Sequence, residues 1–462
     1  MPIASAGAES AEQDRGGKSV RRLVPRSGHA EWGDSSRDPL EILARQDASR
    51  VQGLVPIRYG RMLASPFAFF RGGAAVMTRD LAQAARTQLK AQLCGDAHLS
   101  NFGVYSAPDR RLVFDCNDFD ETCPGPFEWD VKRLAASIAI AGRERAFDKD
   151  QRKQAVLGAV GSYRKSMRRF AGMRNIDVWY ARIDVESRLA AMRSQVAGRR
   201  FRQVERSLSK AEAKDSLRAL RKLTYEEDGR LRIISDPPLI TPLAELTDDP
   251  EAEQLLQPVL AAYTDSLNDD RRYLAESYRY VDAAMKVVGV GSVGTRAWIV
   301  LLLGRDSGDP LFLQAKEAQA SVLEPYLGAS RYRNHGRRVV EGQRLMQAAS
   351  DVFLGWVAAE GIDGVRRNFY VRQLWDGKGS VVIESLSASD LAIYSALCGE
   401  ALARAHARSG ERGAIASYLG GGEAFDKAMA RFAEAYADQN ERDFGQLVEA
   451  VESGKIEAET EL

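Results

Sequence analysis

Residues 95–130 contain polar side chains whose types and spacing could support chemistry on a metal-bound substrate. Asp96 and Asn101 are separated by four residues, and Asp118, followed by Phe119, comes after a short apolar run. A carboxylate can accept the proton of an attacking hydroxyl group, and carboxylate and amide oxygens are ligands for magnesium. We interpret Asp96 as a candidate catalytic base, and Asn101 and Asp118 as candidate metal ligands.

The elements that must position these side chains can be predicted from the local pattern. Residues 112–114 predict a short buried strand that enters the acidic cluster after a turn at 107–109. Asp130 precedes apolar residues with helical spacing over 131–141, which predicts a buried helix. The expected order is therefore loop, strand, acidic cluster and helix.

Alternatives exist for each of these interpretations. Asp115 and Asp120 compete with Asp118 for the metal, and we rank Asp118 first for its Phe and its distance to Asp130. His98 is expected to order the loop rather than to act in catalysis. The whole cluster could also be a metal-free, solvated acidic turn.

With these residues, the stretch resembles the catalytic segment of the aminoglycoside phosphotransferase branch of the protein-kinase-like superfamily. Members carry a Gly-Asp pair, an Asn five residues later, a metal-binding Asp-Phe after the next strand, and an Asp that opens a helix. Cys94 stands where the family usually has His. The resemblance implies that Asp96 is catalytic, that Asn101 and Asp118 hold Mg²⁺, and that Asp130 fixes the catalytic loop through backbone N–H groups.

A glycine-rich motif lies much later in the chain, at Gly289, Gly291 and Gly294. The spacing G-x-G-x-x-G is shared by dinucleotide-binding folds and by kinases. A dinucleotide site needs a helix next, whereas 297–303 is β-branched, aromatic and leucine-rich, and 311–313 is a further apolar strand. The motif therefore predicts a glycine-rich hairpin.

In kinases, such a hairpin covers the ATP phosphates and the next strand carries a Lys that contacts them. The resemblance assigns this role to Lys316, although Arg296 stands where the pattern has Val. The Lys needs a carboxylate partner on the following helix. Glu341 is the first choice, and Glu324 is the fallback.

The order of the elements differs from that of an ordinary kinase. Strands expected at 353–356 and 369–372 complete a five-stranded small lobe with one helix, and 376–380 is a turn or hinge. The helix expected from a capping box at Ser387 would normally run directly into the catalytic loop at 95–103, which here comes some three hundred residues earlier. Circular permutation explains this order.

We therefore predict an α+β, protein-kinase-like fold with two lobes in circularly permuted order. The expected domains are a disordered tail (1–38), a large helical lobe (39–285) with the catalytic loop (95–103) and metal-binding segment (112–130), a small β-rich nucleotide-binding lobe (286–385), returning large-lobe helices (386–450) and an acidic tail (451–462). The chain also resembles the bacterial domain of unknown function 2252 family over most of residues 40–440, through the sequence segments GDAHLSNFG, GQRLMQ and RQLWDGKGS.

Three arginines near the aromatic segment 67–70 have two interpretations. Arg58, Arg61 or Arg71 could contact a phosphate or an acidic substrate, because a guanidinium matches phosphate oxygens. Alternatively, the segment is an apolar plug under the catalytic loop with surface arginines, which we favour.

Composition limits the possible partners and locations. The 462 residues carry a formal net charge of +1, so no global field attracts nucleic acid. Acidic residues are interleaved in the basic segment 199–222, which predicts a solvated helix face. No apolar run is long enough to span a membrane. The four cysteines form no C-x-x-C pair, so the default is a reducing cytoplasm. Oligomeric state is not readable.

The sequence thus predicts an ATP- and magnesium-dependent phosphotransferase of kinase-like type that acts on an unidentified hydroxyl acceptor. One alternative is a nucleotide-binding pseudokinase or a relative that transfers AMP. Another is a metal-dependent phosphohydrolase that uses the carboxylates of 115–121 without ATP.

Overall fold

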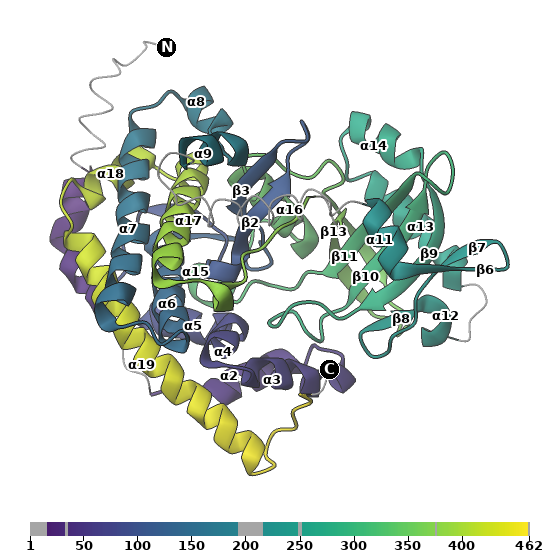
Figure 1. Cartoon of the computed structure of the whole chain (residues 1–462), viewed down its shortest axis with the longest axis horizontal. Coiled ribbons are helices and arrows are strands. Elements are labelled where there is room, and N and C mark those ends of the chain that lie inside the picture. Colours follow the sequence, from purple (N-terminus) through teal and green to yellow (C-terminus); the bar gives the residue numbers. More distant parts are fainter. Residues whose placement is uncertain (1–15, 33–35, 193–215, 248–251, 375–376, 461–462) are drawn as a thin grey trace.

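The computed structural model combines helices with several antiparallel sheets. It describes residues 16–32, 36–192, 216–247, 252–374 and 377–460. In Figure 1, long helices gather on one side and the largest sheet lies on the other. Residues 1–15 and 461–462 of the expected tails, and 199–215 of the basic segment, lie outside the described residues.

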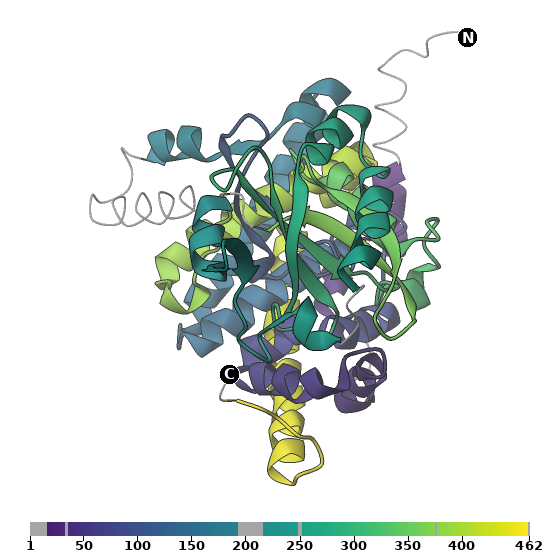
Figure 2. The ribbon, with the colours of Figure 1, turned by 90° about the vertical axis from the view of Figure 1, so that its right-hand side faces the viewer.

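The largest sheet has six antiparallel strands in the order β12-β13-β11-β10-β9-β8. Figure 2 shows the molecule from the side on which this sheet lies. Its strands are β8 (Ile240–Pro242), β9 (Arg279–Lys286), β10 (Ala297–Leu303), β11 (Pro310–Glu317), β12 (Gly355–Glu360) and β13 (Arg366–Gln373). The prediction of five strands is wrong, because the sheet has a sixth strand, β8, which pairs with the outer edge of β9.

Both faces of this sheet are covered because the side chains of its strands alternate. Val300 and Leu302 of β10 pack with Tyr263 of α13 in one apolar cluster. Ile299 and Leu301 of the same strand pack with Ala219 and Leu223 of α11 in another. The helices near the sheet are α11 (Ser216–Leu223), α12 (Leu243–Leu246), α13 (Ala252–Thr264), α14 (Asp269–Glu276) and α16 (His335–Met346). The short α15 (Glu324–Leu327) lies against the segment 123–126 instead.

The part of the expected large helical lobe (39–285) that follows helix α6 (Glu128–Glu144) also contains strands. Besides β8 and β9, it forms the hairpin of β6 (Thr224–Glu227) and β7 (Arg230–Ile233) and the short β5 (Ile183–Asp184). The turn of the hairpin places Asp228 and Gly229 at positive φ, where Asp and Gly are tolerated.

The long helices form the main core. Apolar residues with helical spacing produce α6 (Glu128–Glu144), α7 (Lys149–Ala171), α17 (Ala388–Ser409), α18 (Arg412–Leu419) and α19 (Ala424–Glu452). The expected capping box is present at the start of α17, where Ser387 and Asp390 exchange hydrogen bonds. The remaining helices are α2 (Pro39–Asp47), α3 (Val55–Leu63), α4 (Pro66–Gly72), α5 (Ala74–Gln83), α8 (Asn175–Tyr180) and α9 (Val185–Met192).

Two small hairpins carry the expected catalytic segment. β1 (Lys90–Leu93) pairs with β4 (Cys123–Pro126), and β2 (Phe102–Ser106) pairs with β3 (Leu112–Cys116). The predicted strand at 112–114 is therefore confirmed as part of β3.

The described parts of the two expected tails are ordered. Residues 16–23 are helical, and His29 is buried with its Nε2 2.7 Å from the hydroxyl of Tyr418. At the other end, the backbone N–H of Glu459 donates to the carbonyl of Pro56 over 2.9 Å. These segments lack apolar periodicity, and long-range polar contacts hold them together with single apolar side chains such as Val20 and Ile456.

No helix in the described part of the chain has the length and apolar character to cross a membrane. All four cysteines are buried and unpaired.

Candidate functional site

The loop that carries Asp96 is fixed by Asp130 in the first turn of α6. The two carboxylate oxygens of Asp130 accept hydrogen bonds from the backbone N–H groups of Cys94, at 2.8 Å, and Gly95, at 3.0 Å. His406 lies 3.2 Å from the same carboxylate through Nε2, and its Nδ1 lies 2.9 Å from the hydroxyl of Tyr163. This is the contact with the loop that was expected of Asp130.

Gly95 brings this loop against the acidic segment. Its φ is +82°, and a Cβ at this position would lie 2.3 Å from the carbonyl oxygen of Glu121. Only glycine therefore fits at this crossing.

Asp96 is half-buried and held from several sides. Its carboxylate pairs with Arg133 Nε at 2.7 Å, its carbonyl accepts from Asn101 Nδ2 at 2.8 Å, and His98 Nε2 lies 3.6 Å from Oδ2. Burial raises the pKa of Asp96, and the charges of Arg133 and Arg71 oppose this rise. Burial lowers the pKa of His98 far below its usual range, so this ring is neutral. Its position beside Asp96 agrees with a role in ordering the loop.

The β2–β3 hairpin brings Asn101 and Asp118 to one end. Phe102, which follows Asn101, pairs with Cys116, and the backbone N–H of Asn117 donates to the carbonyl of Asn101 over 2.9 Å. The two candidate metal ligands therefore come from neighbouring backbone segments.

Lys316 of β11 reaches the same acidic segment. Its Nζ lies 2.5 Å from Asp120 Oδ2, and only 4% of its side chain is exposed. Burial alone would lower the pKa of Lys316, but Asp120, Tyr370 and Asp118 together raise it. Burial and the neighbouring Asp120 raise the pKa of Asp118, whereas Lys316 lowers the pKa of Asp120 despite burial. The three charged side chains, Lys316, Asp118 and Asp120, thus shift one another's pKa values.

The glycine-rich segment is a hairpin loop between β9 and β10, as predicted. Within it, Ser292 Oγ lies 3.4 Å from Lys316 Nζ and 3.5 Å from Asp120 Oδ2. The tip of the loop therefore lies over the charged group.

The three motif glycines lie against the N-terminal helices. The carbonyl of Gly289 accepts from Arg61 Nη1 at 2.6 Å. A Cβ on Gly291 would lie 3.3 Å from the carbonyl oxygen of Arg71, and Gly294 has a φ of +87°. The loop therefore joins β9 and β10 while touching the segment 61–72.

The structure does not pair Lys316 with Glu341. Glu341 lies on α16 with one third of its side chain exposed, 3.9 Å from Arg337 and 3.8 Å from Arg344. The fallback, Glu324, lies near His335 and Arg338 instead.

α16 instead turns Arg338 towards the acidic segment. Its guanidinium donates to the carbonyls of Thr122 and Asp120, both at 2.7 Å, and of Gln319 at 2.8 Å. The helix thus holds the backbone beside Asp120, and Asp120 itself provides the counter-charge for Lys316.

Asp115 belongs to the core. It is fully buried, its Oδ1 pairs with Arg404 at 2.6 Å, and its Oδ2 accepts from the N–H of Ala348 at 2.8 Å. Asp118 and Asp120 are only partly buried and remain the candidates for the metal.

The three arginines differ in their surroundings. Arg58 is fully buried and pairs with Asp47 and Gln46, which is a structural role. Arg61 contacts the glycine-rich loop. Arg71 has a buried Nε for which the described residues provide no partner.

The profile of one protein family matches residues 50–450, which is most of the chain. The chain belongs to the DUF2252 family. This family is described as an uncharacterized protein conserved in bacteria. Neither the curated proteins nor the solved structures contain a match to the chain.

Four site residues of this DUF2252 protein were not predicted from the sequence: Arg133, Ser292, Arg372 and Lys378. Arg372 of β13 donates to the carbonyl of Asn117 over 3.2 Å, and its charge acts on Asp118. Burial and the nearby charge of Arg372 lower the pKa of Lys378 to about 7. Only Ser292 carried a signal, since it lies inside the glycine motif.

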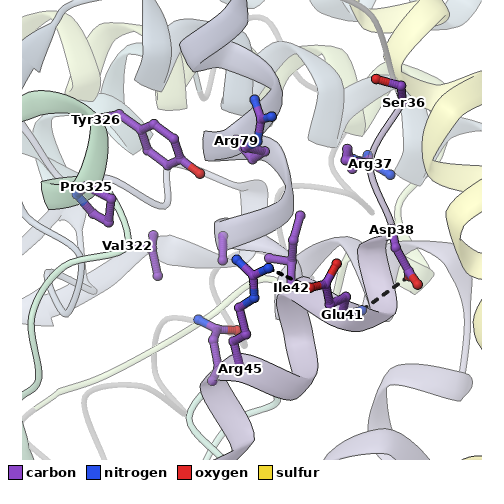
Figure 3. A pocket seen from close by; sticks show the side chains of 12 residues that line it. Ser36, Arg37, Asp38, Glu41, Ile42, Arg45, Arg79, Val322, Pro325 and Tyr326 are labelled. Atoms are coloured by element: carbon purple, nitrogen blue, oxygen red, sulfur yellow. Dashed lines mark hydrogen bonds and ion pairs between the residues drawn. The ribbon is translucent and has the colours of Figure 1, made fainter.

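One pocket of this DUF2252 protein, with a volume of about 470 Å³, is lined by none of these residues (Figure 3). α2 and α5 face Tyr326 across it. A second hollow of about 30 Å³ lies beside Asn117, Arg372 and Lys378. Among the described residues, no three or more His, Cys, Asp or Glu side chains form a metal-binding group.

Proposed function

We propose that this DUF2252 protein is an ATP- and magnesium-dependent phosphotransferase of kinase-like type that acts on a hydroxyl acceptor. One observation carries the proposal: Lys316 Nζ lies 2.5 Å from Asp120 Oδ2, although 196 residues separate them. A buried ammonium beside two carboxylates, under a glycine-rich hairpin, is the arrangement that phosphoryl transfer from ATP requires.

The order of elements supports a kinase-like fold with two lobes. A hairpin with a glycine-rich loop (β9–β10) leads to the strand of Lys316 (β11), then to the single turn of α15, the longer helix α16 and two strands (β12 and β13). β8 is an additional edge strand.

The contacts of α17 support circular permutation. Its final residue, Ser409, accepts a hydrogen bond through Oγ from the backbone N–H of Gln92 in β1 over 2.9 Å. β1 leads directly into the loop of Asp96. The end of α17 and the start of this loop are thus adjacent in space while lying at opposite ends of the chain.

The acidic segment fits a magnesium ion bound together with nucleotide phosphates. Among the described residues, Asp120 Oδ1 is buried without a hydrogen-bond partner, and Asp118 forms no ion pair. Mg²⁺ bound to ATP commonly takes only one or two protein carboxylates and fills its other positions with phosphate oxygens and water. Asp118 and Asn101 would hold the ion, which supplies charge neutralisation at the phosphates.

The chain's own residues have distinct roles in this proposal. Lys316 and Ser292 bind phosphate oxygens, and Arg372 offsets the negative charge beside Asp118. Asp96 orients the acceptor hydroxyl and takes its proton as the acceptor oxygen bonds to the γ-phosphorus and the bond from that phosphorus to ADP breaks. Burial raises the pKa of Asp96, which makes it a better proton acceptor than an exposed carboxylate.

Nucleotide binding without turnover is a second candidate. Among the described residues, no carboxylate of α16 pairs with Lys316, and this favours it, because turnover in kinases needs such a carboxylate to hold the lysine. Transfer of AMP would use the same residues and differ only in the label transferred.

Calorimetry of magnesium–ATP binding tests the metal role, with wild type, Asp118→Asn and Asp96→Asn. We expect Asp118→Asn to weaken the affinity by roughly tenfold or more, the equivalent of about 1.4 kcal/mol, because a metal ligand is lost. Asp96→Asn should retain binding. Equal affinities of wild type and Asp118→Asn would overturn the proposed metal site.

Product analysis tests the transfer itself. Wild type is incubated with a metabolite extract and ATP labelled at the γ- or the α-phosphate. We expect γ-label on an acceptor and a rate roughly 10²–10⁴-fold lower for Asp96→Asn. Transfer of α-label identifies AMP transfer, and binding without either product identifies a pseudokinase.

A further inference from the structure

The glycine-rich loop, residues 287–296 between β9 and β10, is bound to the N-terminal helices as well as to its own sheet. Three of its backbone carbonyls accept hydrogen bonds from residues 50–61, which we call the latch. The pairs are Arg50 Nη1 with Val293, the N–H of Val51 with Gly294 at 2.8 Å, and Arg61 Nη1 with Gly289 at 2.6 Å. A loop that did no more than connect two strands would run over the surface, with its carbonyls open to water.

Apolar side chains of the loop pack against the same latch. Val293 is fully buried in a cluster with Leu54 and Ile57. Val290 packs against a second cluster, which contains Tyr59. Burial of apolar area stabilises such contacts, so polar and apolar interactions together hold the loop on the latch.

The latch is itself anchored to the rest of the helices. Arg58 pairs with Asp47 of α2, and the hydroxyl of Tyr59 donates to the same carboxylate over 2.6 Å. Near the C-terminus, the N–H of Glu459 donates to the carbonyl of Pro56 over 2.9 Å. The latch is therefore fixed in place and can restrain the loop.

The opposite side of the loop lies on the charged side chains that are proposed to meet the phosphates. Ser292 Oγ is 3.4 Å from Lys316 Nζ and 3.5 Å from Asp120 Oδ2. These distances leave no room for another atom between the loop and the two side chains. In the proposed function the phosphates must enter there, so the loop has to move away from Lys316 before nucleotide binds.

We propose that the latch holds the glycine-rich loop closed over Lys316 and Asp120 in the free protein, and that release of the loop from the latch opens the site to nucleotide. This inference rests on the proposed phosphotransferase function. A protein that can bind its ligand only in a partly populated open state has an apparent affinity reduced by that fraction. The latch therefore lowers both the association rate and the affinity for nucleotide.

Two variants weaken the latch without altering the loop itself. Arg61→Met removes a hydrogen bond to the loop, and Ile57→Ala removes part of the apolar cluster beneath it. Arg26→Met is the matched control. Arg26 is half-buried, like Arg61, and also donates to a backbone carbonyl over 2.6 Å, but to that of Leu419.

Hydrogen exchange followed by mass spectrometry measures opening of the loop in the full-length protein without any ligand. We expect the amides of 287–296 to exchange roughly three- to tenfold faster in Arg61→Met, and roughly tenfold faster or more in Ile57→Ala, than in wild type. Arg26→Met should exchange as wild type does. Thermal unfolding checks that each variant is folded, and Arg61→Met remains informative if Ile57→Ala is unstable.

Stopped-flow binding of a fluorescent, non-hydrolysable ATP analogue with Mg²⁺ measures entry of the nucleotide. We expect the association rate to rise in the two latch variants by factors similar to those of the exchange rates, with an increase in affinity. Arg26→Met should again behave as wild type.

Two outcomes overturn the inference. The first is exchange of 287–296 that is equal in wild type and both latch variants. The second is faster exchange together with a lower affinity for the analogue, because the latch would then shape the loop for nucleotide instead of excluding it. Failure of the proposed function gives a different result: wild type itself does not bind the analogue, whereas faster exchange in the latch variants still shows that the latch holds the loop.

Discussion

The carboxylates of residues 96–130 form two groups that differ in how completely protein groups bond to their oxygens. Asp115 and Asp130 anchor the backbone, and their oxygens are engaged by protein groups. Asp96, Asp118 and Asp120 are only partly buried, and their side chains retain some exposure. The buried Oδ1 of Asp120 has no partner among the described residues. The two groups share the same residue type and lie in the same part of the sequence. They differ in whether protein groups bond to all of their carboxylate oxygens.

This comparison distinguishes folding roles from chemical roles. Buried polar atoms are nearly always paired, so an anchoring carboxylate with complete partners contributes to stability. A carboxylate whose partners are incomplete keeps its capacity for a metal, a proton or a substrate. Mutations of the first group should therefore act on the free energy of unfolding, and mutations of the second group on ligand binding or rate.

The largest effect is expected for Asp115→Asn. This change leaves the guanidinium of Arg404, whose side chain is 2% exposed, without its counter-charge. We expect the free energy of unfolding to fall by about 3–5 kcal/mol, as when one partner of a buried ion pair is removed. Urea unfolding followed by circular dichroism measures the change.

An exposed pair provides the control. Asp177→Asn removes a carboxylate that pairs with exposed Arg174 and should change stability little. Adding Arg404→Met to Asp115→Asn should recover part of the loss, since the unpaired charge is then gone. Similar stability of Asp115→Asn and Asp177→Asn would contradict the anchoring role.

The sequence predicted much of the site because its chemistry lies in short motifs. The loop of Asp96, the strand before Asp118 and the hairpin at Gly289–Gly294 all follow from local spacing. The contact of Asp130 with the loop was expected from the resemblance. The position of Lys316 beside the acidic segment depends on the tertiary structure, and only the resemblance predicted it.

The partner of Lys316 could not be predicted, because it depends on how α16 is rotated about its axis. Arg338 and Glu341 are three residues apart, about one turn along the same side of the helix, so their spacing does not tell which of them reaches the acidic segment. The fold had similar limits. β8 has only three residues, and long-range polar bonds such as that of His29 to Tyr418 leave no periodic pattern.

Glu121 lies on the border between the two groups, and its substitution should have an intermediate effect. Its Oε2 accepts from the N–H of Val322 at 2.7 Å, yet its charge faces Asp120 and Asp96. Burial raises the pKa of Glu121 to about 7, with Arg338 opposing the rise. The folded protein therefore holds a proton that the unfolded chain releases at about pH 4.5.

The sign of the pH effect follows from this proton. The stability that Glu121 contributes is fully present below about pH 4.5 and is lost as the pH rises through about 7. Glu121→Gln stays neutral and should remove this loss, which amounts to roughly 1–3 kcal/mol. Urea unfolding at pH 5 and pH 8 should show a smaller decrease for Glu121→Gln than for wild type. Exposed Glu276→Gln is the control, and a decrease equal to that of wild type in Glu121→Gln would show that Glu121 does not hold the proton.

The smallest effect is expected for Glu341→Gln, which tests the choice of partner for Lys316. Glu341 has only long contacts with Arg337 and Arg344 at the surface, so its loss should change stability by less than about 0.5 kcal/mol. Affinity for magnesium–ATP, measured by calorimetry, should also stay as in wild type, whereas Asp120→Asn should alter it because Asp120 pairs with Lys316. A marked loss of affinity in Glu341→Gln would mean that α16 rotates when nucleotide binds and brings Glu341 to Lys316. In that case the pair predicted from the sequence would belong to the nucleotide-bound state, and the pair with Asp120 to the free protein.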